Sequence, residues 1–171
     1  TLIISAHYDH LGKRGSDIYN GADDNGSGTS TVLRIAETLS NYKALGGTFK
    51  RSIQILFFTG EEKGLLGSEY YVNQPLIPLE NTIADLNVDM IGRVDKAHLD
   101  NENYVYVIGS DRLSMDLHEM GESVNRDHIG LDLDYTFNKK DDPNRFYYRS
   151  DHFNFAKNNI PVIFYFSGVH E

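Results

Sequence analysis

The stretch IQILFFTGEE, residues 53–62, carries the strongest structural signal in this sequence of 171 residues. Its first six residues are almost continuously apolar, which is typical of a strand buried on both faces in a helix-covered parallel sheet. Two glutamates, Glu61 and Glu62, follow after only Thr59 and Gly60. Carboxylates so close to a buried strand are seldom buried themselves unless they are paired or bind a metal. The stretch therefore predicts a buried strand with acidic chemistry at its carboxyl end.

Short apolar runs alternate with helical patterns along the rest of the chain. Further strands are predicted at residues 2–5, 83–90, 104–108 and 162–166. Helices are predicted where apolar residues recur every three or four positions, at residues 29–39, 65–72, 113–124 and 153–158. Residues 132–145 are polar and predict an exposed loop. The alternation predicts one α/β domain, residues 1–171, with a largely parallel sheet covered by helices.

Three predicted strands run into side chains that bind metals or move protons. These side chains are His7 and Asp9, Glu61 and Glu62, and Asp89. A glycine- and aspartate-rich loop, residues 20–28, precedes a predicted helix with Asn25 or Ser27 as its N-cap. Open α/β sheets bind ligands beyond the carboxyl ends of their strands, so these groups are expected to meet in one crevice.

Each of these pieces also has an ordinary interpretation. A His-x-Asp sequence can be a surface pair, Asp-Asp-Asn-Gly can be a turn, and Glu-Glu is usually solvated. Their shared place at strand ends favours a metal site over three unrelated surface features. The remaining histidines outside these motifs, among them His98, His118 and His128, are expected at the surface.

The composition narrows the classes of function. A formal net charge of −9 argues against nucleic acid or an anionic membrane surface as a partner, since both bind basic patches. No apolar run is long enough to span a bilayer. The absence of cysteine excludes disulfides, thiolate metal sites and cysteine nucleophiles. The sequence begins at Thr1, directly before a strand, and is expected to be a fragment truncated at both ends.

Five motifs follow one another between Ser5 and Phe166: HYDHLG, GADDNGSG, FFTGEEKGLLGS, NVDMIGR and RSDHFNF…NNIPVIFYF. In order and context they resemble those of the bacterial two-zinc (co-catalytic) aminopeptidases, a group that also includes glutamate carboxypeptidase and glutaminyl cyclase. The resemblance implies a three-layer α/β/α sandwich with a mixed, largely parallel central sheet. It also implies release of N-terminal residues from peptides with a free N-terminus, and a location outside the cytoplasm.

The resemblance assigns metal ligands by their place in the motifs. It implies that His7 and Asp89 bind one zinc ion, that Glu62 binds a second, and that Asp24 bridges both. Imidazole and carboxylate groups suit zinc, and two metals can share one bridging carboxylate. The resemblance also implies a cis peptide bond between Asp24 and Asn25.

Three further roles follow from the resemblance. Glu61 resembles the general base that takes a proton from water, and Asp9 resembles the carboxylate that orients His7. Arg149 resembles a residue that contacts the substrate in some relatives. No ligand role falls to His10, because the family uses only the first histidine of that motif.

The last zinc ligand of the family is a histidine in a Tyr-His pair that follows the last strand. The sequence ends at Glu171 without that pair, so the ligand is expected beyond it. His170 is an alternative, although relatives carry a similar residue a few positions before the true ligand. Two zinc ions are expected in the full-length enzyme and fewer in this fragment.

Three alternatives to an aminopeptidase stay open. A glutaminyl cyclase-like transferase would use one zinc ion. A carboxypeptidase for acidic C-termini would need a basic pocket, for which the chain offers only scattered arginines such as Arg93, Arg145 and Arg149. A non-catalytic binding domain would have lost its metals. The metal content per chain separates the first and last of these from the aminopeptidase.

Overall fold

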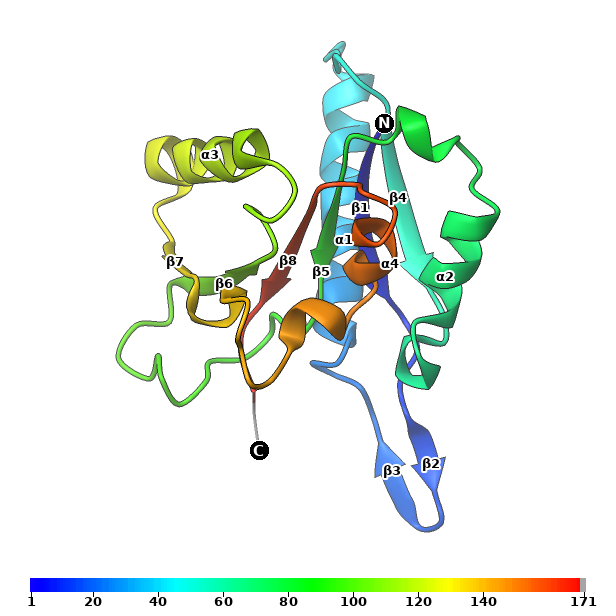
Figure 1. Cartoon of the computed structure of the whole chain (residues 1–171), viewed down its shortest axis with the longest axis vertical. Coiled ribbons are helices and arrows are strands. Elements are labelled where there is room, and N and C mark those ends of the chain that lie inside the picture. Colours follow the sequence, from blue (N-terminus) through cyan, green and yellow to red (C-terminus); the bar gives the residue numbers. More distant parts are fainter. Residues whose placement is uncertain (170–171) are drawn as a thin grey trace.

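The computed structural model describes residues 1–169 and contains a six-stranded central sheet (Figure 1). From one edge to the other, the strands follow the order β4-β1-β5-β8-β6-β7. Their bounds are Leu2–His7 for β1, Ile53–Phe58 for β4, Ala84–Val88 for β5, Tyr104–Ile108 for β6, Asp132–Asp134 for β7 and Val162–Phe166 for β8. Every strand predicted from an apolar run is confirmed.

The sheet is mixed and largely parallel, as predicted. Strands β4, β1, β5 and β8 pair in parallel, β6 runs antiparallel to β8, and β7 pairs in parallel with β6. The register places His7 beside Phe58 and Ser5 beside Asn87. The carboxyl ends of β4, β1 and β5 therefore lie next to one another at one end of the sheet, where such folds bind ligands.

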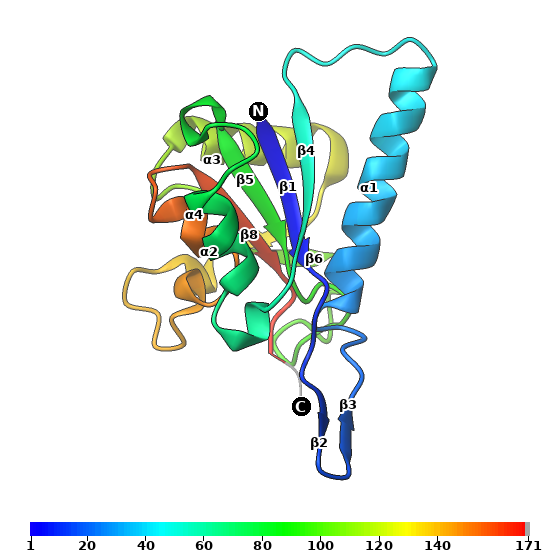
Figure 2. The ribbon, with the colours of Figure 1, turned by 90° about the vertical axis from the view of Figure 1, so that its right-hand side faces the viewer.

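Helices cover both faces of the sheet, so the fold has three layers (Figure 2). The α-helices of the described chain are α1 (Gly26–Ala44), α2 (Leu66–Asn73), α3 (Met115–Val124) and α4 (His152–Ala156). Successive residues of a strand point to opposite faces. Ile4 accordingly packs in the cluster that contains Val32 of α1, whereas Ile3 packs with Phe155 of α4 in the larger, aromatic cluster.

The face between α1 and α3 carries an apolar hollow of about 440 Å³. Its lining includes Ile35 of α1, Val124 of α3, and Val88 and Ile163 of the sheet. None of the side chains predicted to bind metal or substrate lines this hollow. Its lining is suited to apolar contacts rather than to metal binding.

Two features of the structure were not predicted. A two-stranded antiparallel hairpin, β2 (Gly12–Arg14) and β3 (Asp17–Tyr19), projects from the body beside the end of β1 (Figure 2). The expected loop at residues 132–145 contains the short strand β7 and the single-turn helix η4 (Thr136–Asn138). Both features are too short to leave a periodic apolar pattern in the sequence. No helix within the described residues is long and apolar enough to cross a membrane.

A line of buried polar side chains lies beneath the carboxyl ends of the strands. Asp85, Asn87 and Asp89 alternate along β5 and its end, and therefore share one face. The Ser5 hydroxyl lies 2.7 Å from Asp85 Oδ1 and 3.1 Å from Asn87 Oδ1. Asn87 donates to Ser150 Oγ over 2.8 Å, and Ser150 donates to Asp89 Oδ2 over 2.6 Å. This polar line connects the interior of the sheet to its functional edge.

Asp85 is the member of this line with the strongest consequence for stability. It is fully buried, and its Oδ2 atom has no hydrogen-bond partner. Burial raises the pKa of Asp85 to about 8, against the smaller, lowering effect of the Ser5 hydrogen bond. In the unfolded chain an aspartate has a pKa of about 3.9. The folded state thus holds a proton that the unfolded state releases, and the free energy of unfolding falls as the pH rises between those two values.

We expect Asp85→Asn to flatten this pH dependence. Relative to the variant, the free energy of unfolding of the wild type should fall by up to about 1.4 kcal/mol per pH unit between the unfolded and folded pKa values. Urea unfolding at pH 5, 6, 7 and 8 measures this difference, with the exposed Asp100→Asn as the matched control. A constant difference between wild type and Asp85→Asn across this range would show that Asp85 is ionised in the folded protein.

Candidate metal centre

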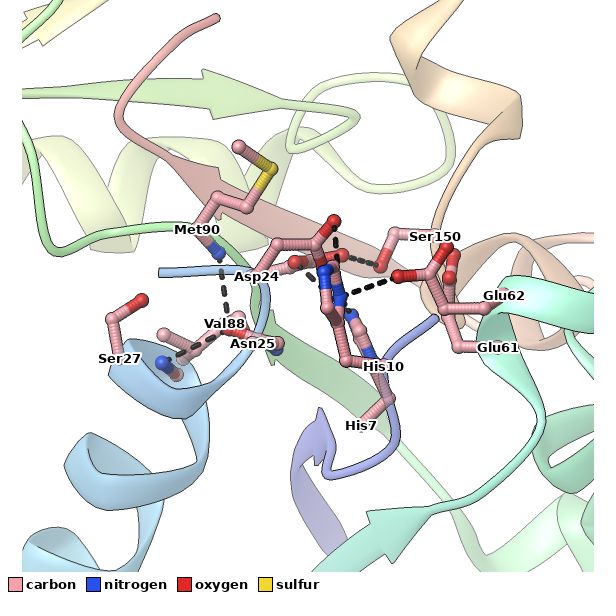
Figure 3. Close-up of polar contacts among 12 residues, drawn as sticks. His7, His10, Asp24, Asn25, Ser27, Glu61, Glu62, Val88, Met90 and Ser150 are labelled. Atoms are coloured by element: carbon pink, nitrogen blue, oxygen red, sulfur yellow. Dashed lines mark hydrogen bonds and ion pairs between the residues drawn. The ribbon is translucent and has the colours of Figure 1, made fainter. Parts of the chain in front are cut away.

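Six side chains with metal-binding or proton-transfer chemistry meet at the carboxyl edge of the sheet. They come from the ends of three adjacent strands and from the loops that follow them (Figure 3). The strand ends supply His7, Glu61, Glu62 and Asp89, the loop before α1 supplies Asp24, and the segment after β1 supplies His10. The convergence predicted from the strand ends is therefore present in the structure.

One group of atoms forms a three-ligand set around His7. His7 Nε2 lies 3.2 Å from Asp24 Oδ1 and 3.3 Å from Asp89 Oδ1. These three atoms lie within 4.8 Å of one another, a spacing that one metal ion can span. His7 and Asp89 are buried, and Asp24 is partly exposed. One nitrogen and two oxygens in this arrangement match the ligands that catalytic zinc sites use.

The other ring nitrogen of His7 is held by the residue that follows two positions later. Nδ1 lies 3.1 Å from the backbone carbonyl oxygen of Asp9 and 3.6 Å from the Asp9 carboxylate. We expected the carboxylate to orient the ring, whereas the nearer oxygen is the carbonyl. The carboxylate instead accepts a hydrogen bond from the backbone N–H of Glu61 over 3.2 Å. Asp9 thus contacts both the His7 ring and the segment that carries the two glutamates.

A second three-ligand set faces the other oxygen of Asp24. It consists of His10, Asp24 and Glu62, whose ligand atoms also lie within 4.8 Å of one another. His10 Nδ1 lies 2.6 Å from Glu62 Oε1 and 3.8 Å from Asp24 Oδ2. Because Asp24 turns Oδ1 towards His7 and Oδ2 towards His10, its carboxylate stands between the two sets. This placement is the one required of the bridging ligand predicted at Asp24.

The clustered carboxylates of the centre favour a bound cation. Burial works against a charged imidazole, yet Asp24 and Asp89 outweigh it and raise the pKa of His7 to about 12. Burial, reinforced by Asp89, raises the pKa of Glu61 to about 8, and burial together with Asp24 raises the pKa of Glu62. The carboxylates destabilise one another's ionised forms. Zinc fits the nitrogen and oxygen donors present and supplies the missing positive charge.

The loop that carries Asp24 is fixed to the end of β5 by Asn25. The Asn25 side chain donates to the carbonyl oxygen of Val88 over 2.9 Å, and its Oδ1 accepts from the N–H groups of Gly28 and Met90. The peptide bond between Asp24 and Asn25 is cis, which confirms the prediction. Asn25 is also the N-cap of α1, one of the two caps expected from the sequence.

A second pair of contacts fastens the same loop to the segment after β5. Asp23 Oδ1 accepts from the N–H of Gly92 over 2.8 Å. Ser27 Oγ accepts from the N–H of Ile91 over 3.0 Å and donates to the Asp23 carbonyl. Asp24 is therefore flanked on both sides by residues bonded to the β5 end, so its carboxylate is held against Asp89.

Sequence reasoning missed the burial of two polar side chains, Asp151 and His98. Asp151, in the RSDH motif, is fully buried and accepts from the Ser68 hydroxyl over 2.5 Å, and burial raises its pKa to about 7. His98 is not at the surface as expected. It is buried, stacks on Tyr104, and lies between the carboxylates of Asp95 and Asp134. The polar neighbourhood of His98 in the sequence gave no sign of this packing.

The structure does not place Arg149 at the centre. Arg149 is exposed, and its guanidinium lies 5.1 Å from the centroid of the Phe146 ring. Its role in substrate binding stays a prediction. His170, the alternative zinc ligand, lies outside the described residues.

Comparison with known proteins agrees with this geometry. The model of peptidase family M28 matches residues 1–170. The chain belongs to peptidase family M28. This confirms the resemblance to the zinc aminopeptidase group that the five motifs indicated, and the M28 chain has the sheet and helix arrangement of that group.

Individual relatives of this M28 chain are aminopeptidases. Leucine aminopeptidase 2 of Trichophyton rubrum is 29% identical over 171 residues, which cover 98% of this chain and 31% of that protein. The LapA aminopeptidase of Legionella pneumophila superposes with a TM-score of 0.75 at 26% identity, over 99% of this chain and 42% of the other. The zinc aminopeptidase BSAP of Bacillus subtilis gives a TM-score of 0.65 at 27% identity, over 99% and 38%. The chain thus spans less than half the length of each of these relatives.

The close approach of Gly28 to the Asn25 side chain generates a prediction. A Cβ atom at position 28 would collide with Asn25 Oδ1 and with the carbonyl oxygen of Val88, which is backbone and cannot rotate away. We expect Gly28→Ala to destabilise the fold by about 1–3 kcal/mol through overpacking. Zinc affinity should fall as well, because the loop that carries Asp24 must shift. Urea unfolding and zinc titration measure the two effects.

Gly121→Ala is the matched control for this change. Gly121 lies in α3, and a Cβ there meets only Ile163 at an ordinary contact distance of 4.0 Å. A glycine to alanine change within a helix should stabilise it by up to about 1 kcal/mol and leave zinc affinity unchanged. Equal zinc affinity in Gly28→Ala and wild type would contradict the role given to the Asn25 contacts.

Proposed function

We propose that this chain is the catalytic core of a zinc-dependent aminopeptidase that binds two zinc ions and releases N-terminal amino acids from peptides. The observation that carries the proposal is the Asp24 carboxylate, whose two oxygens face two separate sets of ligand atoms. A carboxylate in this position can be shared by two metal ions. The names of the fungal, Legionella and Bacillus relatives support the choice of an aminopeptidase within family M28.

Different residues of the chain face the two proposed metal positions. His7 and Asp89 face one position, Glu62 faces the other, and Asp24 faces both. When bound, zinc acidifies water and polarises the carbonyl of the scissile bond. Ser150 donates to Asp89 Oδ2, so Oδ1 is left free to point at the metal position. The Asp9 carbonyl accepts from His7 Nδ1–H and thereby keeps the Nε2 lone pair directed at the same position.

Glu61 is the residue we assign as the general base. It belongs to neither ligand set, although it is adjacent to Glu62 and close enough to Asp89 and His7 for their charges to act on its pKa. Its backbone N–H donates to the Asp9 carboxylate, which fixes the start of the single-turn helix η1 (Glu61–Lys63). A free carboxylate here can take a proton from water and return it to the departing amine.

The excess of carboxylates also suits the substrate. A free N-terminal amine is a cation, and acidic groups that are not fully neutralised by metal can bind it through charge-assisted hydrogen bonds. Among the described residues, Arg149 is exposed and lies against Phe146, which gives no support to a basic pocket for an acidic C-terminus. Recognition of the amine by this acidic edge favours an aminopeptidase over a carboxypeptidase. Action outside the cytoplasm belongs to the same proposal and rests on the family resemblance alone.

Glu61→Gln tests the catalytic assignment in the full protein. The amide keeps the shape of the side chain and cannot accept the proton, so turnover of an aminoacyl arylamide should fall by about 10²–10⁴-fold. Zinc content, measured by atomic emission after dialysis, should stay at two ions per chain. The exposed Glu102→Gln is the control and should match the wild type in both measurements.

Each contrary result points to a different error. Loss of zinc in Glu61→Gln would make Glu61 a ligand and reverse its role with Glu62. One zinc ion per wild-type chain would favour a cyclase-like transferase. Wild-type protein with two zinc ions and no peptidase turnover on any aminoacyl substrate would favour a binding domain.

A further inference from the structure

A buried cluster of hydrogen bonds joins the first turns of α2 and α4, which lie side by side on one face of the sheet (Figure 2). The cluster consists of Ser68 of α2, Asn154 of α4, and Asp151, which directly precedes α4. At most 1% of each residue is exposed. None of the three belongs to either set of metal-binding atoms, so their burial needs another explanation.

The direction of each hydrogen bond in this cluster follows from the hydrogens available. The Asn154 amide has two, which it donates to the Leu65 carbonyl oxygen over 3.1 Å and to Ser68 Oγ over 2.7 Å. The Ser68 hydroxyl has one, which the closer Asp151 Oδ1 accepts in preference to the Leu65 carbonyl oxygen at 3.2 Å. Asp151 is therefore the final acceptor of a series of bonds that ends, on its other side, at Leu65.

Asp151 lies at the N-cap of α4, yet its side chain does not cap that helix. An aspartate at this position usually accepts hydrogen bonds from the backbone N–H groups of the first turn, and Asp151 makes no such bond. Its Oδ1 accepts from Ser68 of the neighbouring helix instead, and its Oδ2 is buried without a hydrogen-bond partner among the described residues. Burial of a carboxylate in this way is unfavourable, which points to a role for the contact with Ser68.

Leu65 lies at the end of the turn that carries the two glutamates, and its backbone is strained. Its φ of 61° is rare for a residue with a side chain and persists only where the surroundings hold it. The Leu65 N–H donates to the Glu61 carbonyl oxygen over 2.9 Å, and the Leu65 carbonyl oxygen accepts from Asn154. The Glu61 N–H in turn donates to the Asp9 carboxylate. The backbone of Glu61 is therefore fixed on both sides, on one of them through the buried cluster.

Glu61 depends on this turn more than its neighbour Glu62 does. Glu62 belongs to a set of metal-binding atoms, so a metal ion that it binds also holds its side chain. Glu61 belongs to neither set, and the direction of its side chain is set by the backbone of the turn.

We propose that Asp151 is a positioning residue which, through Ser68 and Asn154, holds the turn at Leu65 and thereby the carboxylate of Glu61. This inference rests on the proposed function, in which Glu61 is the general base. A displacement of about 1 Å at a catalytic group can lower turnover about 100-fold. Loss of the Asp151 contact should therefore lower kcat, whereas KM and zinc content should stay as in the wild type.

Steady-state kinetics of the zinc-loaded full protein on an aminoacyl arylamide give the first test. In Asp151→Ala, kcat should fall about 10–100-fold at unchanged KM and zinc content. Asp151→Asn keeps an oxygen acceptor for the Ser68 hydroxyl and should recover most of the lost kcat. Ser68→Ala, a smaller change to the fold, should lower kcat as Asp151→Ala does. The control Asn73→Ala removes an exposed hydrogen bond to Glu69 in the same helix and should match the wild type.

Amide hydrogen exchange in the metal-free protein tests the turn independently of activity. The N–H groups of Gly64 and Leu65 both donate to the Glu61 carbonyl oxygen. In Asp151→Ala these two groups should exchange at least about 10-fold faster than in the wild type, because local opening of the turn becomes easier. Asn73→Ala should leave both rates unchanged.

Three results would overturn the positioning role of Asp151. They are wild-type exchange rates in both Asp151→Ala and Ser68→Ala, wild-type kcat in both variants, and no recovery of kcat in Asp151→Asn. A wild type that binds zinc without any peptidase turnover would refute the proposed function instead, and the exchange rates would then decide whether the cluster holds the turn.

Discussion

The site depends on the Asn25 side chain, which joins the start of α1 to the end of β5. Its amide donates to Val88 and accepts from Gly28 and Met90, so one buried side chain caps a helix and fixes a loop against a strand. Asp24 directly precedes it and is therefore carried to Asp89 and His7. Loss of these hydrogen bonds would leave buried backbone groups unpaired, which costs more than the bonds themselves contribute. The fold thus specifies the position of the Asp24 carboxylate, the bridging ligand that we propose.

Repulsion between the carboxylates of the site opposes this arrangement. Four carboxylates from different elements, those of Asp24, Glu61, Glu62 and Asp89, lie within mutual electrostatic range, and burial raises the pKa of both glutamates. Such an arrangement costs stability, and cations that bind only the folded state restore it. The buried polar side chains from Asp85 to Ser150 also lower the stability of the sheet interior. Burial keeps Asp85 uncharged there. The cost in stability therefore accompanies a rigid set of side chains whose donor atoms suit metal binding.

The sequence predicts the strands and the convergence of the candidate ligands well because their signals are local. Apolar runs such as residues 53–58 define strands, and His7, Glu62 and Asp89 follow strand ends directly. The features that the sequence does not predict depend on packing between distant segments. The place of His10 depends on its contact with Gly21. The buried Asp85 is hydrogen-bonded by Ser5, which comes from another strand. The hairpin and β7 are missed because three-residue strands show no periodicity.

The central claim is that Asp24 stands between two metal positions at this edge of the sheet. A crystal of the zinc-loaded protein, measured at the zinc absorption edge, locates the metals directly in an anomalous difference map. The account predicts two peaks about 3.5–4 Å apart, one on each oxygen of Asp24. One peak should lie against His7 and Asp89 and the other against Glu62. A single peak, or two peaks of which either lies away from Asp24, would contradict it.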